Sequence, residues 1–186
     1  MVTHLQGLRG QLLLAMPTMQ DARFQDSVIL VCSHDEEGCM GLMVNRPQQI
    51  LVDDVLQDLN ITLSRPIGQP VYEGGPLDTF RGFVLHDSHY IYESTMQISK
   101  RLHLTASRDL LEALGRDEGP SNYLLILGYA GWGGGQLEEE LANNDWLIAP
   151  ASEQLLFHEP PAARWQYAAL SMGIERSQLS SQIGHA

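Results

Sequence analysis

The chain has 186 residues, a length that fits a single domain. Its content of 44% hydrophobic and 18% charged residues is typical of a globular protein and argues against a disordered chain. The formal net charge of −12 disfavours direct nucleic-acid binding, because proteins that bind nucleic acid usually present a basic face. We therefore expect one acidic domain over residues 1–186, with a loose polar tail at residues 173–186.

The cysteine content and the distribution of apolar residues predict the cellular compartment. The two cysteines, Cys32 and Cys39, are fewer than a secreted domain held by disulfides usually carries. The apolar run from Leu12 to Ala15 is short for a signal peptide and is soon followed by Pro17. No apolar stretch reaches the ~20 residues of a membrane helix. The sequence thus predicts a cytoplasmic protein with reduced thiols and no membrane segment.

The first third of the chain contains the clearest predicted hairpin. A strand is expected at residues 8–15, and residues 27–34 (SVILVCSH) are typical of an interior strand because both faces are apolar. Residues 35–38 (DEEG) indicate a turn, and residues 39–45 (CMGLMVN) are expected to return as the second strand. Asn45 closes this hairpin and is expected to fix its end through the side-chain amide, although it is also a candidate surface residue.

The rest of the chain alternates short strands and short helices. Apolar side chains at residues 52–59 follow helical spacing, and Ser107 is a candidate N-cap for a helix at residues 107–114. Residues 123–129 (YLLILGY) are expected to form a buried strand. Further strands are expected at residues 71–73, 82–86, 91–93 and 146–148, and further helices at residues 136–142, 152–157 and 164–172. Because strands outnumber long helices and short turns join several of them, the pattern predicts an α+β fold with a mixed sheet.

Several segments between Gly10 and Phe157 resemble the AlgH/YqgE family of bacterial proteins and occur in the family's order. They are LLLAMPTMQDARFQDSVILVCSH, GCMGLMVNRP, VYEGGPLDTFRGFVLH, LLILGYAGWGGGQLEEELANNDWLIAPAS and LLF. The resemblance implies a single compact α+β domain whose mixed sheet curls strongly, as a pseudo-barrel, and is flanked by helices. It also implies a role in transcriptional regulation, from which the family takes its name, with no assigned reaction, cofactor or catalytic residue. Cys32 and His34 match the family's Cys-x-His pattern, whereas the family commonly has a small residue such as alanine in place of Cys39.

Cys32, His34 and Cys39 form the first candidate site. Residues two apart share a face of a strand, so Cys32 and His34 are expected on the same side of the sheet. If residues 35–38 close the hairpin, His34 faces Cys39 and Cys32 faces Gly41, which clusters all three side chains. A nearby imidazolium would lower the pKa of a thiol and favour the reactive thiolate, which suits a redox sensor. Thiolates and an imidazole would also suit zinc.

Two considerations weigh against chemistry at these thiols. The diagonal pair Cys32 and Cys39 would lie roughly 7–8 Å apart, too far for an unstrained disulfide. A zinc site lacks a visible fourth ligand, so no metal is expected. We favour the alternative that Cys32 is a small apolar residue buried in an interior strand.

The glycine-rich segment 128–135 carries Trp132 and leads into Gln136. A strand-to-helix turn of this kind can present backbone amides to an anion, but the segment lacks the lysine of a phosphate-binding loop. Trp132 could pack on the sheet against the glycines. Alternatively, Trp132, Gln136 and Glu138 belong to an exposed surface that binds a partner.

Three consecutive acids follow this segment, at Glu138, Glu139 and Glu140. They would repel phosphate at the start of a helix. They also point in different directions around that helix, so they are expected to be solvated and not to converge on a metal or substrate.

A second predicted surface includes Gly74, Gly75, Arg81 and His86. The two glycines permit a tight turn between strands. The guanidinium of Arg81 could bind a carboxylate or phosphate as a fork, although an ion pair with an internal acid such as Glu73 is the favoured alternative. His86 ends an apolar strand, where a lone histidine is more often a hydrogen-bonded structural residue than a ligand.

The sequence contains no GxSxG or HExxH signature, and no cofactor is expected. We therefore expect a non-catalytic regulatory or binding protein that acts through a protein partner, without direct DNA contact. The first alternative is a thiol redox sensor centred on Cys32 and His34. The second is an enzyme or small-ligand binder whose polar groups converge only in the fold, the candidates being His34, Arg81, His86 and Glu138.

Overall fold

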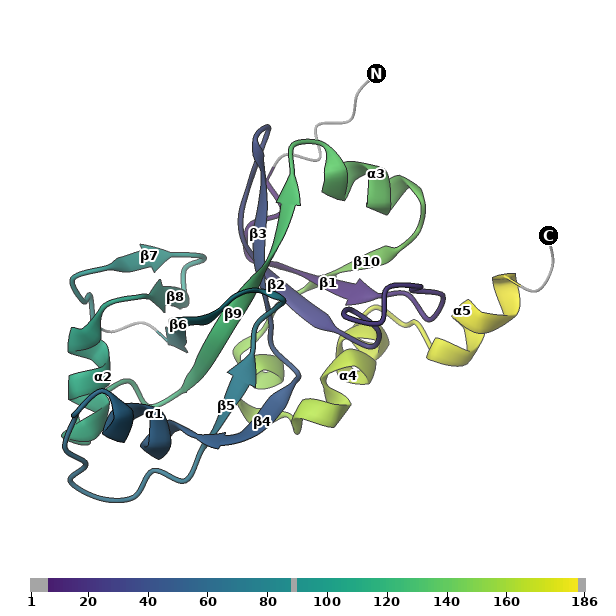
Figure 1. The fold of residues 1–186 in the computed structure, drawn as a ribbon. Helices are drawn as coiled ribbons and strands as arrows, with labels where there is room; N and C mark the ends of the chain where they lie inside the picture. The colour runs from purple at the N-terminus through teal and green to yellow at the C-terminus, as the bar shows by residue number, and fades with distance from the viewer. Residues whose placement is uncertain (1–6, 88–89, 184–186) are drawn as a thin grey trace.

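The computed structural model describes residues 7–87 and 90–183, which form a single α+β domain on one strongly curled mixed sheet (Figure 1). The predicted fold class is confirmed. The strands are β1 (Gln11–Ala15), β2 (Val28–Asp35), β3 (Gly38–Met43), β4 (Pro47–Leu51), β5 (Pro70–Glu73), β6 (Leu77–Asp87), β7 (Thr95–Gln97), β8 (Leu102–Thr105), β9 (Tyr123–Gly133) and β10 (Trp146–Pro150). The helices are α1 (Val52–Asp58), α2 (Arg108–Gly115), α3 (Gln136–Ala142), α4 (Arg164–Ser171) and α5 (Arg176–Ile183), with a π-helical turn at Gln154–His158 and a 3-10 turn at Pro161–Ala163.

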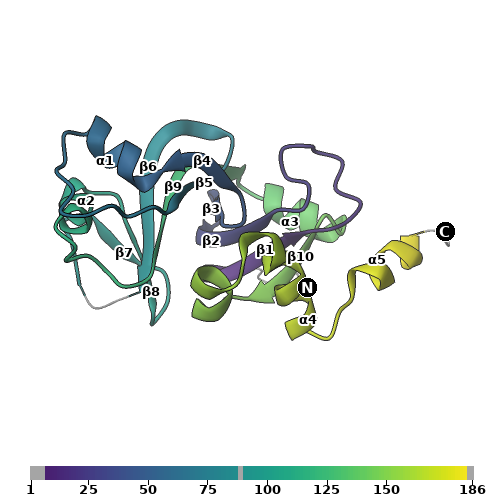
Figure 2. The same ribbon diagram turned by 90° about the horizontal axis from the view of Figure 1, so that it is seen from below.

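Strand β9 joins the two halves of the sheet, whose strand order is β10-β1-β2-β3-β9-β6-β8-β7. Its C-terminal part, residues 130–133, pairs with β3, and its N-terminal part, residues 123–127, pairs with β6. Strand β5 runs parallel to β9 and also pairs with β4, so the sheet is mixed. Seen from below, α1 and α2 lie with β6, β7 and β8, whereas α3 and α4 lie with β1 and β10 (Figure 2).

Successive side chains of the central strands point to opposite faces of the sheet and belong to separate parts of the core. Leu30 of β2 belongs to the large cluster that contains Trp165 of α4, whereas its neighbour Val31 belongs to a second cluster around Trp132. A third cluster lies beneath α1 and α2 and includes Leu125 of β9. The continuous apolar run of β2 follows from this arrangement, because both faces of the strand are covered.

The short edge strands depart from the sequence prediction. The predicted strand at residues 91–93 is wrong, and the strand lies instead at Thr95–Gln97, where it pairs with the unexpected strand Leu102–Thr105. Strand Pro47–Leu51 was also unexpected, since most of its side chains are exposed and no buried face marks it in the sequence. No helix in the described part of the chain combines the length and apolar character needed to cross a bilayer.

The segment 173–183 is the described part of the tail that the sequence predicts to be loose, and residues 184–186 lie outside the described residues. It contains helix α5, and Ile174 and Leu179 pack against the main core. Arg176 pairs with Asp26 and lies 5.0 Å from the ring centroid of Trp165. These contacts fasten a polar segment whose attachment depends on residues far away in the sequence.

Candidate functional site

A β-bulge separates the predicted thiol cluster. Val31 pairs with Gly41 and Ser33 pairs with Met40, so Cys32 is the extra residue of β2. An inserted residue reverses which side chains face each side of the sheet beyond it. The prediction that Cys32 faces Gly41 and shares a face with His34 is therefore wrong, although the predicted pairing of His34 with Cys39 is confirmed.

The two thiols lie in different core clusters. Cys32 belongs to the large cluster, where its Sγ lies 3.7 Å from the carbonyl oxygen of Leu30, and Cys39 belongs to the cluster around Trp132. Burial raises the pKa of the Cys32 thiol, with a further increase from Cys39. Burial, together with the nearby charges of Glu138 and Asp35, raises the pKa of Cys39 to about 12. Both environments disfavour the thiolate that redox chemistry requires.

His34 is bound to Glu138 of helix α3. Its Nε2 lies 2.6 Å from Oε1 of Glu138, and its Nδ1 accepts a hydrogen bond from the backbone N–H of Leu8 at 3.5 Å. Because Nδ1 acts as an acceptor, Nε2 carries the proton and donates it to the carboxylate. The His34 side chain is almost fully buried, so the pair holds α3 against the hairpin.

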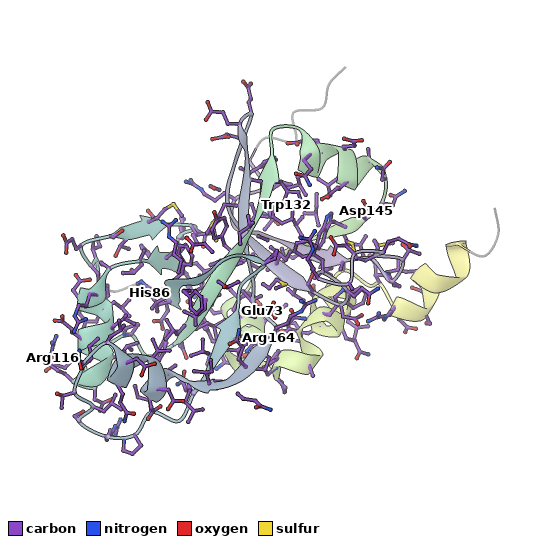
Figure 3. All side chains as sticks on the ribbon, in the orientation of Figure 1. Glu73, His86, Arg116, Trp132, Asp145 and Arg164 are labelled. Carbon is purple, nitrogen blue, oxygen red and sulfur yellow. The ribbon has the colours of Figure 1, made fainter. Side chains whose placement is uncertain are left out.

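Trp132 is buried and does not form the exposed surface that the sequence suggests. Its Nε1 donates to Oε2 of Glu140 at 2.6 Å, and Nε1 of Trp146 donates to the same oxygen at 3.0 Å. Phe24 covers the two indoles. Trp132 lies on the part of β9 that pairs with β3, near α3 (Figure 3). The packing alternative for this residue is the one observed.

The remaining polar residues of α3 and its N-terminus are also structural. Gln136 is exposed, and its Oε1 accepts the backbone N–H of Gly133 at 3.0 Å. The three consecutive acids diverge as predicted, but only Glu139 is exposed, because Glu138 and Glu140 are bonded to buried partners. The prediction of a fully solvated acidic face is therefore wrong.

Gly74 and Gly75 are buried against β9, so they do not belong to an exposed binding surface. A Cβ at Gly74 would lie 2.2 Å from the carbonyl oxygen of Gly128, and one at Gly75 would lie 2.2 Å from the carbonyl group of Tyr129. Both positions therefore require glycine because of the close approach of two backbones. Asn45 ties down its turn as expected, since its Oδ1 accepts from Val28 N–H and its Nδ2 donates to the Asp26 carbonyl.

His86 is a buried structural residue, in agreement with the favoured sequence interpretation. Its Nδ1 lies 2.8 Å from the Asp87 carbonyl oxygen, so that nitrogen donates. Its Nε2 then accepts from the Thr105 hydroxyl at 2.8 Å, and Thr105 in turn accepts from Thr95 at 2.9 Å. Burial lowers the pKa of His86, the positive charge of a protonated His103 acts in the same direction, and the chain of hydrogen bonds fits a neutral imidazole.

The four polar residues proposed for a hidden active site do not converge. His34 of the hairpin pairs with Glu138 of α3, whereas His86 of β6 is buried and bonded to Thr105 of β8. Arg81 lies on β6 beside Phe83, with its Cζ 5.2 Å from the ring centroid, and does not pair with Glu73. No group of three or more metal-ligating side chains comes together within residues 7–87 and 90–183.

Strand β6 instead borders two hollows on opposite faces. Phe80, Gly82 and Val84 line one hollow, with apolar side chains of α1, α2 and β9. Arg81 and Phe83 line the other, with side chains of β3, β8 and β9. Alternate residues point to opposite sides of a strand, which explains how one segment serves both.

Phe80 is the exposed aromatic that sequence reasoning missed. It is 93% exposed. The register of β6 against β9 shifts between Leu77 and Gly82, so residues 78–81 bulge out of the regular pairing. The apolar character of Phe80 suggests a core position, and no pattern in the sequence predicts the bulge that places its side chain in solvent.

Comparisons with known proteins identify relatives over nearly the whole chain. The AlgH-like family model matches residues 12–177. A UPF0301 protein of Methylococcus capsulatus is 46% identical over 180 residues, covering 96% of each chain, and one of Vibrio vulnificus is 45% identical over 96% of this chain and 99% of its own.

Two solved structures have the same fold. The solution structure of the AlgH protein from Pseudomonas aeruginosa is 42% identical, covers 96% of each chain and superposes with a TM-score of 0.79. A protein from Corynebacterium diphtheriae, 23% identical, covers 94% of this chain and 92% of its own with a TM-score of 0.75, which shows the shared fold alone. The resemblance predicted from the hairpin and glycine-rich segments is thus confirmed, and the chain belongs to the AlgH-like family.

Proposed function

We propose that this AlgH-like protein is a non-catalytic binding protein that regulates transcription through a protein partner, which docks on the hollow beside Phe80. The exposure of Phe80 carries the proposal. The adjoining hollow has a volume of about 580 Å³, and its apolar walls come from Val55, Leu59, Leu125 and Leu127.

An exposed phenylalanine beside an apolar hollow favours association with another surface. Burying such a side chain stabilises a complex by roughly 1.5–3 kcal/mol. Leu59 at the same hollow is also 39% exposed, so the apolar surface extends beyond one residue. Aromatic anchors that fill pockets carry much of the binding energy of protein interfaces.

The charge of the chain favours a protein partner over DNA. The net charge is −12, which repels the phosphate backbone. The hollow has one acid and one base at its border, Asp58 and Arg108, and Arg108 is already paired with Glu112. A partner with an apolar contact surface suits this site better than a polyanion.

The two alternative functions have less support. A thiol sensor at Cys32 and His34 loses its geometric basis, because the two residues lie on opposite faces and burial raises the pKa of the thiol. An enzyme built from His34, Arg81, His86 and Glu138 lacks a common cleft for these groups.

The test places a photo-crosslinking amino acid at position 80 of the full chain, in cells that produce the protein naturally. The matched control carries the same amino acid at position 91, because Ile91 is 86% exposed and does not line the hollow. We expect a discrete crosslinked protein from position 80 and none from position 91.

Two substitutions then measure how strongly partner binding depends on the side chain of Phe80. Phe80→Ser is expected to weaken binding of the purified partner by at least about 10-fold, and Ile91→Ser to leave it unchanged. Equal binding by the Phe80→Ser and wild-type proteins would exclude Phe80 as the docking residue. A mobility-shift assay at low salt tests the DNA alternative, and a specific shift by the purified chain would contradict the partner mechanism.

A further inference from the structure

The second hollow beside β6 has the features of a small-molecule site. Its volume is about 490 Å³, within the usual range of ligand pockets. The apolar side chains of Met40, Phe83, Leu104 and Tyr129 line it, and they come from β3, β6, β8 and β9. Because three of these strands belong to the central part of the sheet, the walls are held by a rigid scaffold.

Arg81 provides a cation at this hollow. Among the described residues, its guanidinium donates no hydrogen bond and has no acidic side chain within 4.0 Å. The guanidinium lies over the ring of Phe83, 5.2 Å from the centroid, which orients it beside the apolar wall. Several other arginines are paired with acidic side chains, as in Arg65 with Asp117 and Arg108 with Glu112.

Glu93 limits the charge of a compatible ligand. It lines the same hollow, and its carboxylate forms no hydrogen bond or ion pair with a described side chain. A ligand with two negative charges would be repelled by this carboxylate and by the net charge of −12. A single carboxylate needs only the planar fork of Arg81, which matches it in geometry.

We propose that this hollow binds a monocarboxylate with an apolar body, whose carboxylate pairs with Arg81 and whose body contacts Phe83, Leu104 and Tyr129. The site lies on the face of β6 opposite to Phe80, so it goes beyond the proposed partner surface and does not depend on it. The hydroxyl of Ser94, which also lines the hollow, is available to the second carboxylate oxygen.

The experiment titrates the full chain with defined probes and follows backbone amide resonances by NMR. The probes are 3-phenylpropionate and octanoate, with 3-phenylpropan-1-ol as the neutral analogue and phenyl phosphate as the dianion. At least one acid is expected to bind saturably below about 10 mM, with shifts at Phe83, Leu104 and Tyr129. The alcohol and the phosphate are expected to bind at least about 10-fold more weakly.

Two arginine variants separate charge recognition from general effects. Arg81→Gln is expected to weaken acid binding about 10-fold and to remove the preference over the alcohol, with an unchanged melting temperature. Arg116→Gln is the matched control, because Arg116 is exposed, pairs with Glu118 and does not line the hollow. Phe80→Ser should leave acid binding intact, which distinguishes this site from the docking surface.

Three results would overturn the proposal. One is the absence of saturable binding by either acid up to about 10 mM. Another is equal affinity for 3-phenylpropionate and 3-phenylpropan-1-ol. The third is acid binding that persists unchanged in Arg81→Gln, or that shifts the amides around Leu111 on the opposite face instead of those around Phe83.

Discussion

His34 and Glu138 are 104 positions apart in the sequence, and their Nε2 and Oε1 atoms lie 2.6 Å apart. The contact joins the β2–β3 hairpin to helix α3. It explains how the side chain of His34 can be almost fully buried, since its ring N–H is donated to a carboxylate. The consequences for stability can be measured directly.

Replacing Glu138 should loosen the attachment of α3. Glu138→Ala leaves the buried N–H of His34 without an acceptor, so the free energy of unfolding should fall by about 1–3 kcal/mol. Urea denaturation followed by circular dichroism measures the change. Glu139→Ala is the control, because Glu139 is its exposed neighbour, and it should change stability by no more than about 0.5 kcal/mol. Equal effects of the two substitutions would show that the hydrogen bond between His34 and Glu138 contributes nothing to stability.

Replacing Glu140 should disturb both tryptophans that it binds. Glu140→Ala removes the acceptor of Trp132 and Trp146, so we expect a loss of about 2–4 kcal/mol and altered tryptophan fluorescence. Glu140→Gln keeps a side-chain oxygen and should recover part of the stability. Wild-type stability in Glu140→Ala would contradict a role for this carboxylate in the cluster.

The thiols should react slowly in the folded chain. The raised pKa of Cys39, about 12, and the burial of Cys32 leave little thiolate near neutral pH. Reaction with a disulfide reagent at pH 8 should be at least about 100-fold slower than in urea, and Cys39→Ala assigns the remaining signal to Cys32. Rapid stoichiometric labelling of the folded protein would restore the redox hypothesis.

The neutral state of His86 should make stability depend on pH. Its folded-state pKa is lowered, so below the unfolded value of about 6.5 the unfolded chain binds more protons. The stabilisation is therefore present above pH 6.5 and is lost as the pH falls towards the folded-state pKa. Comparing urea unfolding of wild type and His86→Leu between pH 7.5 and 5 should show a stability difference that shrinks on acidification. A difference that stays constant across this range would contradict the lowered pKa.

Adding a methyl group at Gly75 should be strongly destabilising. The new Cβ would overlap the backbone of Tyr129, so Gly75→Ala should lower the free energy of unfolding by at least about 2 kcal/mol. Gly82→Ala is the control, since the nearest atom to its Cβ would be a side-chain carbon of Leu127 at 3.6 Å. Thermal unfolding of both variants measures the contrast. Similar melting temperatures would contradict the close backbone approach at Gly75.

The sequence by itself determined the α+β class, the hairpin and the family, because these depend on local signals. These signals are the alternation of apolar residues, the turn residues and the order of the segments. Small irregularities of the backbone do not change them. The buried run of β2 and the amide of Asn45 were interpreted correctly for this reason. Strand Pro47–Leu51, whose side chains are mostly exposed, lacks such a local pattern and was missed, as was the four-residue strand Leu102–Thr105 between β6 and β7.

Only the tertiary structure decided which residues face solvent, core or one another. One extra residue at Cys32 places the His34 side chain on the opposite face of the sheet from the Cys32 side chain. A bulge at residues 78–81 exposes Phe80. Similarly, Trp132 is buried because Phe24 packs against it from a distant part of the chain and Glu140 of α3 accepts its indole N–H. Periodicity assumes a regular strand and says nothing about what packs above it, so bulges and long-range contacts determine the candidate sites.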